Sequence, residues 1–207
     1  QHNGPIDAIF IPVGGGGLLA GVAAYVKHLH PKTRIIGVEV EGSNCMDAAL
    51  KAGKRVKLPL ETLDLFADGV SVAQAGLLPF KIASKYVDEI VVVNVDEICA
   101  AIKDVFEDTR GVSEPAGALA IAGMKRYLRD HPGMSSVVAI VSGANVNFDR
   151  LRHISERAEV GEAREAVLAV TIDEAQGSFL NFCRALGKRS ITEFNYRYAD
   201  ATGAHIY

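Results

Sequence analysis

Short, continuous apolar runs alternate along this chain with segments in which apolar residues recur every three or four positions. A short run bounded by Gly, Pro or Asn is typical of a buried strand, and the recurring spacing is typical of an amphipathic helix. The alternation predicts an α/β fold with a parallel, doubly wound sheet. The predicted strands are residues 9–13, 34–40, 89–93 and 136–141, and the predicted helices are residues 18–29, 43–52, 76–86, 96–108 and 115–127.

The residues around these elements predict how several of them begin and end. Ser43 or Asn44 is expected to cap the second helix, which Gly53 then stops. An acidic cap at Asp96 is expected to open the fourth helix. Residues 54–65 predict a loop that includes an edge strand, and residues 66–72 predict a turn around an Asp-Gly pair.

The last quarter of the chain has a different pattern. Residues 151–164 are highly charged and predict a surface helix and connector. Strands at 166–172 and 190–198 flank a helix at 177–186, and a turn at 200–203 precedes another strand, as in the first half of a ferredoxin-like domain. We therefore expect domains at residues 1–164 and 165–207. Gln1 is not a methionine and the last strand is unfinished, so we expect a fragment cut inside a domain at both ends.

Four consecutive glycines, Gly14–Gly17, follow the first strand and open the first helix. Such a loop brings several N–H groups within reach of one anion, and the helix adds the positive end of its dipole. Phosphate binding is the favoured interpretation, because one or two glycines would suffice for tight packing alone. Gly15, Gly17 and Ala20 also fit a dinucleotide G-x-G-x-x-A spacing, with Glu39 or Glu41 as the acidic residue about 20 positions on.

Two further positions have both a structural and a functional interpretation. Ser142-Gly143-Ala144-Asn145 follows the fourth strand, where ligands bind in doubly wound sheets, but these residues are also common in plain turns. Glu114 precedes Pro115 at a predicted helix start. Its carboxylate either complements the helix dipole, which the residues by themselves favour, or faces the same cleft.

The composition excludes several classes of protein. The 207 residues are 49% hydrophobic and carry a net charge of −3, with basic and acidic residues interspersed, so nucleic-acid binding is not expected. No apolar run is long enough to cross a bilayer, so no membrane association is expected. Cys45, Cys99 and Cys183 are widely spaced, which indicates reduced thiols in a cytosol-like compartment and neither disulfides nor zinc ligands.

With these residues in place, the sequence resembles the biosynthetic threonine ammonia-lyases (threonine dehydratases), fold-type-II pyridoxal phosphate enzymes. The resemblance covers nearly the whole chain. It rests first on the glycine loop with Leu18 and on residues 142–148, with the sequence SGANVNF. Three further motifs support it: Phe66-Ala67-Asp68-Gly69-Val70, Glu114-Pro115-Ala116-Gly117-Ala118 and Glu193-Phe194-Asn195-Tyr196-Arg197-Tyr198.

The resemblance implies roles for individual residues. Gly14, Gly15, Gly16, Gly17 and Leu18 would bind the phosphate of pyridoxal 5'-phosphate. Ser142 would hydrogen-bond the pyridine nitrogen, Gly69 would lie against the ring face, and Glu114 would stand near the ring. A neutral hydroxyl does not hold a proton on the nitrogen as an aspartate would, which favours prompt β-elimination over racemisation or transamination.

The family's reaction converts L-threonine into 2-oxobutanoate and ammonia, the first step towards isoleucine. Residues 165–207 would begin an ACT-like regulatory domain that senses isoleucine as inhibitor and valine as activator. The resemblance also implies a homotetramer, located in the cytoplasm or, in a plant, in the plastid stroma.

Two departures limit what the resemblance implies. Cys45 stands where metal-binding relatives have a carboxylate, so no metal site is expected. The lysine that forms the Schiff base should lie upstream of residue 1, so we assign no catalytic residue here and expect the fragment to be inert. The alternatives are a serine dehydratase or racemase of the same fold type, a nucleotide-binding Rossmann module, and a non-catalytic amino-acid sensor.

Overall fold

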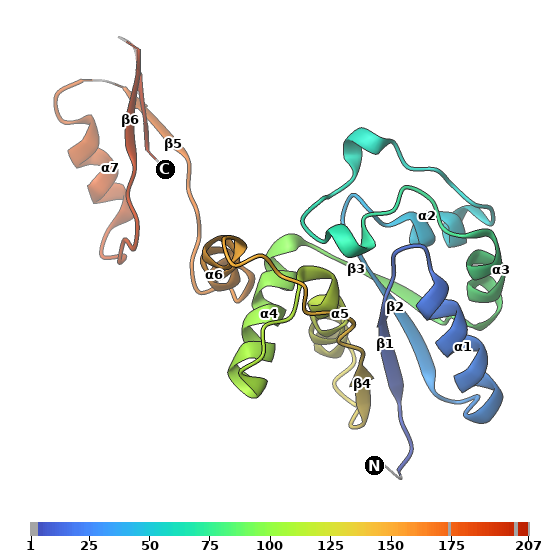
Figure 1. Ribbon diagram of the computed structural model, residues 1–207. Coiled ribbons are helices and arrows are strands. Elements are labelled where there is room, and N and C mark those ends of the chain that lie inside the picture. The colour runs from blue at the N-terminus through green and yellow to red at the C-terminus, as the bar shows by residue number, and fades with distance from the viewer. Residues whose placement is uncertain (1–3, 174, 201–202, 207) are drawn as a thin grey trace. The chain divides into compact units, whose positions relative to one another are not determined.

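The computed structural model describes residues 4–173, 175–200 and 203–206 (Figure 1). The chain divides into two compact units, Gln1–Arg164 and Glu165–Tyr207. The elements of the first unit are β1 Ala8–Pro12, α1 Gly17–Leu29, β2 Arg34–Val40, α2 Cys45–Ala52, η1 Leu60–Thr62, η2 Asp68–Val70, α3 Leu77–Tyr86, β3 Glu89–Val93, α4 Val95–Thr109, α5 Pro115–Asp130, β4 Val137–Ala139 and α6 Arg150–Gly161. Those of the second unit are β5 Val170–Asp173, α7 Ser178–Leu186, β6 Tyr196–Asp200 and β7 Gly203–Ile206.

The first unit is built on a four-stranded sheet in the order β3-β2-β1-β4. Every neighbouring pair is parallel, and β1 pairs with β2 on one side and with β4 on the other. The predicted doubly wound parallel sheet is therefore confirmed. The chain first builds outwards from β1 to β2 and β3, then returns through α4 and α5 to place β4 on the free side of β1.

Helices cover both faces of this sheet (Figure 1). One face packs α1, α2 and α3 against Ile9, Ile11 and Ile35, and the other packs α4 and α5 against Phe10 and Ile36. Successive residues of a strand point to opposite faces, so each buried run contributes to both cores at once. This explains why the strands are mainly apolar and do not alternate regularly with polar residues.

Most predicted elements are present, with corrections at their ends. The prediction of an acidic cap for α4 is wrong, because Asn94 caps this helix. Its side-chain oxygen accepts the Glu97 N–H at 3.0 Å, and Glu97 Oε2 accepts the Asn94 N–H at 3.0 Å, which forms a capping box. Asn44 occupies the N-cap position of α2 and Gly53 ends that helix in a left-handed conformation, as predicted.

Other corrections concern segments with few partners. Residues 54–65 contain the single turn η1 where an edge strand was predicted, whereas η2 lies inside the predicted turn at 66–72. The strand predicted at 136–141 is shorter, because β4 is an edge strand that pairs with β1 over three residues only. The strands predicted at 166–172 and 190–198 are likewise displaced, to 170–173 and 196–200.

The charged segment before the second unit is more than a surface connector. Helix α6 packs against α4 and buries Ile154 and Ala158 in the first unit's core. Its charged residues bind α4 in the same contact, since Arg157 Nε lies 2.6 Å from Asp96 Oδ1 and Lys103 Nζ lies 2.5 Å from Glu159 Oε1. The high charge of this segment therefore describes one face of a packed helix.

In the second unit, β7 lies between β5 and β6 and is antiparallel to both. The β5-α7-β6 connection is therefore a split βαβ unit, as the ferredoxin-like prediction requires. The Phe179 ring of α7 packs edge-on against Phe194 with ring centroids 5.4 Å apart. The turn expected at 200–203 includes residues 201 and 202, which lie outside the described residues. No helix in the described part of the chain is long and apolar enough to cross a membrane.

The close packing of α5 on β2 yields a test of the fold. A Cβ on Gly123 would overlap both methyl groups of Val38, so we expect Gly123→Ala to destabilise the full-length protein by about 1–3 kcal/mol, measured from its urea unfolding midpoint. The matched control is Gly21→Ala in α1, where a Cβ meets no described atom within 4 Å and Ala favours the helix. A Gly123→Ala protein as stable as this control would contradict the packing.

Candidate functional site

Two loops meet beside each other at the carboxyl edge of the central strands. The glycine loop follows β1, and residues 142–145 follow β4, the neighbouring strand of the sheet. The Ile140 N–H donates to the Phe10 carbonyl at 3.1 Å, which continues the pairing to the end of β4. Because the strand order reverses between β1 and β4, this edge is the topological switch point of the sheet, where doubly wound proteins bind ligands.

The glycine loop is held in shape by contacts with three other segments. Gly16 is the N-cap of α1 and has a left-handed φ of +88°, and a Cβ there would overlap the Met46 methyl group. A Cβ on Gly14 would lie 3.1 Å from Val70 Cα. The Gly15 carbonyl accepts the Gly76 N–H at 2.9 Å. Gly14 and Gly16 are therefore required by the protein's own packing.

Gly15 and Gly17 are different, because a Cβ at either position would meet no described atom within 4 Å. Both are exposed, and neither has a left-handed backbone. The Ala20 N–H is the first of α1 to make a helical hydrogen bond, to the Gly16 carbonyl at 2.9 Å, so the N–H groups before it have no partner inside the helix. Free amides at the positive end of a helix dipole form a site for an anion.

Glu114 holds the loop after β4 at two points. It is the N-cap residue of α5, and its N–H donates to the Gly143 carbonyl at 3.2 Å. Its Oε2 accepts the Asn145 N–H at 3.0 Å. The carboxylate thus bonds the neighbouring loop, and its side chain makes no capping hydrogen bond to α5 among the described residues. The helix-start interpretation of Glu114 is therefore incomplete.

We call the bonds of Glu114 to Gly143 and Asn145 the Glu114 clamp. Ser142 directly precedes Gly143 and contacts the first turn of α5. Its exposed hydroxyl donates to the Ala116 carbonyl at 3.4 Å, a long hydrogen bond that a better acceptor could replace. Gly117 and Gly143 make the approach possible, since a Cβ on Gly117 would overlap the Gly143 carbonyl and one on Gly143 would overlap Glu114 Oε1.

Gly69, in η2, connects the glycine loop to the Glu114 clamp. A Cβ on Gly69 would lie 3.0 Å from the Ala116 Cβ and 3.8 Å from Glu114 Oε1. Its neighbour Val70 packs on Gly14. Segments that are far apart in sequence are thus joined by contacts, and these segments contain every predicted site residue except Leu18. Leu18, the remaining predicted residue, is 45% exposed in the first turn of α1.

Sequence reasoning missed two residues that shape this site. Gly76 donates its N–H to the glycine loop, and Gly117 lets the loop after β4 approach α5. Both positions are glycines at or next to a helix start, which is a weak signal. Nothing in the sequence pairs residue 76 with residue 15, because that contact depends on how α3 docks beside α1.

Glu39, one of the two acids considered for a dinucleotide site, has another role. Its side chain is 0% exposed, and its oxygens accept the Met46 and Asp47 N–H groups at the start of α2, each at 2.8 Å. Burial raises its pKa from 4.5 to about 7, although the two amide hydrogen bonds oppose the shift. Both carboxylate oxygens are occupied, so Glu39 is not available to a ribose.

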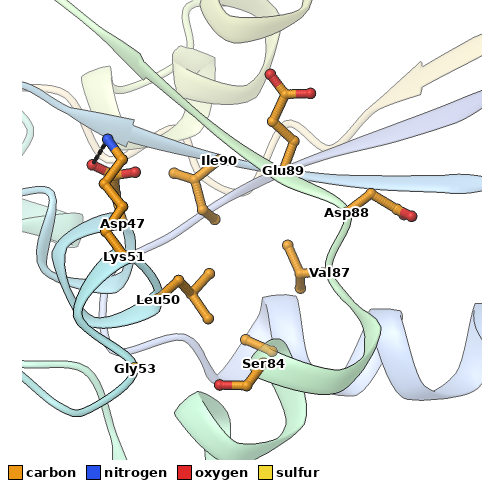
Figure 2. A pocket seen from close by; sticks show the side chains of 10 residues that line it. Asp47, Leu50, Lys51, Gly53, Ser84, Val87, Asp88, Glu89 and Ile90 are labelled. Atoms are coloured by element: carbon orange, nitrogen blue, oxygen red, sulfur yellow. Dashed lines mark hydrogen bonds and ion pairs between the residues drawn. The ribbon is translucent and has the colours of Figure 1, made fainter.

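A separate pocket of about 660 Å³ lies at the amino end of β3 (Figure 2). Leu50, Val87 and Ile90 point into it, and Lys51 is ion-paired with Asp47 at 2.8 Å on its wall. The glycine loop follows the opposite, carboxyl end of the parallel strands, so this pocket is no part of the site. Within the described residues, no three His, Cys, Asp or Glu side chains gather closely enough to hold a metal ion.

The fold and site together define an α/β protein with a glycine-rich loop, open on one side, at the switch point of a parallel sheet. Residues 1–143 match the family model of the pyridoxal-phosphate dependent enzymes, and the chain belongs to this family. Residues 156–207 match a second model, the C-terminal regulatory domain of threonine dehydratase.

The relatives are similar over the whole chain. It is 57% identical to the L-threonine dehydratase biosynthetic IlvA of Burkholderia multivorans, over 100% of this chain and 41% of that protein. The corresponding Escherichia coli protein is 55% identical, over 100% of this chain and 40% of its own length. The chain therefore spans about two-fifths of the length of these curated relatives.

Solved structures agree with this family. The processed form of threonine deaminase isoform 2 from Solanum lycopersicum has a TM-score of 0.72 and 47% identity, over 74% of this chain and 44% of that chain. Serine racemase from Dictyostelium discoideum has a TM-score of 0.63 and 33% identity, over 70% of this chain and 45% of that chain.

The raised pKa of Glu39 predicts a pH dependence of stability. Between about pH 4.5 and about pH 7 the folded protein keeps a proton on Glu39 that the unfolded chain loses, so this group's contribution to stability falls as the pH rises through that window. We expect the free energy of unfolding of the full-length Glu39→Gln protein to fall less than that of the wild type between about pH 4.5 and about pH 7, as measured by urea unfolding. Glu41→Gln, at an exposed carboxylate two residues away, is the control and keeps the wild-type slope. Parallel profiles for Glu39→Gln and wild type would contradict the assignment.

Proposed function

We propose that the full-length protein is a pyridoxal phosphate-dependent threonine ammonia-lyase. It converts L-threonine into 2-oxobutanoate and ammonia: β-elimination removes one water, and hydrolysis of the resulting imine takes one water up again and releases ammonia. The observation that carries the proposal is a glycine loop, open on one side, beside a neutral serine at the end of the adjacent strand. The printed names of the relatives at 55–57% identity support threonine as the substrate.

The glycine loop fits the phosphate of this cofactor. Gly15 and Gly17 have no packing reason to be glycine, because a Cβ at either position would meet no described atom within 4 Å. A phosphate that approaches the backbone closely gives that reason. We therefore assign phosphate binding to Gly14, Gly15, Gly16, Gly17 and Leu18.

Ser142 is assigned to the ring nitrogen of the cofactor. When bound, the cofactor draws electrons away from the α-carbon of the amino acid and so makes its proton removable. A neutral hydroxyl favours the ring nitrogen without a proton, whereas a carboxylate would favour the protonated form. The weaker electron withdrawal favours loss of the β-hydroxyl over chemistry that needs a long-lived carbanion.

Glu114 and Gly69 are assigned to the surroundings of the ring. Glu114 keeps the loop that carries Ser142 in position through its bonds to Gly143 and Asn145. Gly69 lies beside Ala116 and Glu114, and we assign it to the ring face because the motif of residues 66–70 resembles that of the family. The lysine that binds the cofactor covalently is assigned to a part of the protein outside this chain.

We further propose that the first unit is catalytic and the second unit regulatory. Residues 1–164 form part of the catalytic domain, and residues 165–207 begin an ACT-like regulatory domain that responds to isoleucine as inhibitor and valine as activator. The match of residues 156–207 to the threonine dehydratase regulatory domain supports this division and favours threonine over the serine dehydratase or racemase alternative. A homotetramer in the cytoplasm, or in the plastid stroma of a plant, completes the proposal.

The open side of Gly15 gives a first test. We expect Gly15→Ala to raise the dissociation constant of pyridoxal phosphate at least about tenfold in the full-length enzyme, because the added methyl occupies the phosphate's space, while the urea midpoint stays unchanged. Gly133→Ala, at an exposed glycine with equally open surroundings, is the control. Equal cofactor affinity in the two variants would contradict phosphate binding at this loop.

The second test concerns Ser142. We expect Ser142→Ala to lower kcat for 2-oxobutanoate release from L-threonine about tenfold, since one hydrogen bond to the ring is lost. Ser84→Ala is matched, because the exposed Ser84 hydroxyl also donates to a main-chain carbonyl, that of Phe80 at 2.8 Å. A wild-type enzyme that releases no 2-oxobutanoate would refute the proposed function itself, and an unaffected Ser142→Ala would refute only the role of Ser142.

A further inference from the structure

Helix α6 makes two contacts with Phe66, a residue that no site assignment includes. Arg150, the first residue of α6, donates from its guanidinium to the Phe66 carbonyl at 3.2 Å. One turn further on, the His153 ring lies edge-on to the Phe66 ring with centroids 5.9 Å apart. A charged donor fixes the main chain of Phe66 and an aromatic contact fixes its side chain.

Phe66 begins the short segment that passes through the candidate site. Ala67 is fully buried in the core, Gly69 lies beside Glu114 and Ala116, and Val70 packs on Gly14. The Phe66 N–H in turn donates to Asp64 Oδ1 at 2.8 Å. The segment is tightly turned, so a shift of Phe66 moves the surface on which both the glycine loop and the Glu114 clamp rest.

The opposite end of α6 is tied to α4 by charge and by close packing. Lys103 binds Glu159 at 2.5 Å and Glu162 at 3.0 Å, and a Cβ on Gly161 would overlap the Asp96 carbonyl. Ile154 and Ala158, in the middle of α6, are buried in the core of the first unit. Helix α6 ends at Gly161, and the second unit begins at Glu165, four residues later.

We propose that Arg150 and His153 are positioning residues that couple the second unit to the cofactor site through Phe66. An effector that changes how the second unit is held biases the position of α6, and α6 transmits that bias to the Phe66–Val70 segment. An effector acts only through its different affinity for the two arrangements, so loss of this link reduces inhibition without removing the effector site. This inference rests on the proposed threonine ammonia-lyase function.

The test uses the full-length enzyme and L-isoleucine as the probe. The measured quantity is the ratio of kcat/KM for L-threonine without and with saturating isoleucine, which reports the coupling directly. We expect Arg150→Leu to lower this ratio at least fivefold, while equilibrium dialysis without threonine still detects isoleucine binding. Arg150→Lys keeps a donor for the Phe66 carbonyl and is expected to retain most of the wild-type ratio.

Arg152→Leu is the matched control, with the same change of charge in the same turn of α6, at a side chain that pairs with Glu156 on the exposed face. We expect it to keep the wild-type ratio. If Arg150→Leu does not fold, the milder His153→Ala and Phe66→Leu pair tests the ring contact, and non-additive effects on the ratio are expected.

Several results would overturn the inference: a wild-type ratio in Arg150→Leu, an equal loss in Arg152→Leu, additive effects of the pair, or a wild-type enzyme whose kcat/KM is not changed by isoleucine. Failure of the wild-type enzyme to deaminate threonine would instead refute the underlying function.

Discussion

The pairing of β1 with a parallel strand on each side is the constraint on which the rest of this molecule depends. It brings the end of β4, which lies more than 120 residues further along the chain, beside the loop that follows β1. The loop after β4 is held by Glu114, whose N–H and carboxylate bond the Gly143 carbonyl and the Asn145 N–H, and the glycine loop is held by the Gly76 N–H. The shape of this site is therefore set largely by close backbone packing at its glycines.

The glycines of the first loop divide into two groups with different physical causes. Gly14 and Gly16 are small because the Val70 main chain and the Met46 methyl group occupy the space beside them. Gly15 and Gly17 face open space. A separate observation weakens the dinucleotide alternative. Glu39, the buried acid near the end of β2, uses both carboxylate oxygens to accept N–H groups at the start of α2. Its role is structural, and its carboxylate is not free to bind a ribose.

The charged segment before the second unit shows how composition and packing can lead to different conclusions. Its many ionic side chains suggest a solvated connector, yet α6 packs against α4 and buries Ile154 and Ala158 in the core. The ion pairs with Asp96 and Lys103 lie at the margin of this contact. Between them they fix the register of α6, and that register places Arg150 beside the Phe66 carbonyl.

The sequence by itself determined the class of fold, the phosphate-binding interpretation of Gly14–Gly17 and the order of the elements, because apolar periodicity and glycine loops are local properties. It also marked Glu114, Gly69 and Ser142, through motifs that resemble a known family. Only the tertiary structure decided which neighbours these residues meet: Gly76 on the glycine loop, Gly117 against Gly143, Glu39 on α2 and Arg150 on Phe66. It also decided the ends of the edge strands, since a strand extends only as far as its partner does. Each of these contacts joins segments whose approach depends on how helices dock on the sheet, and no local pattern encodes that distance.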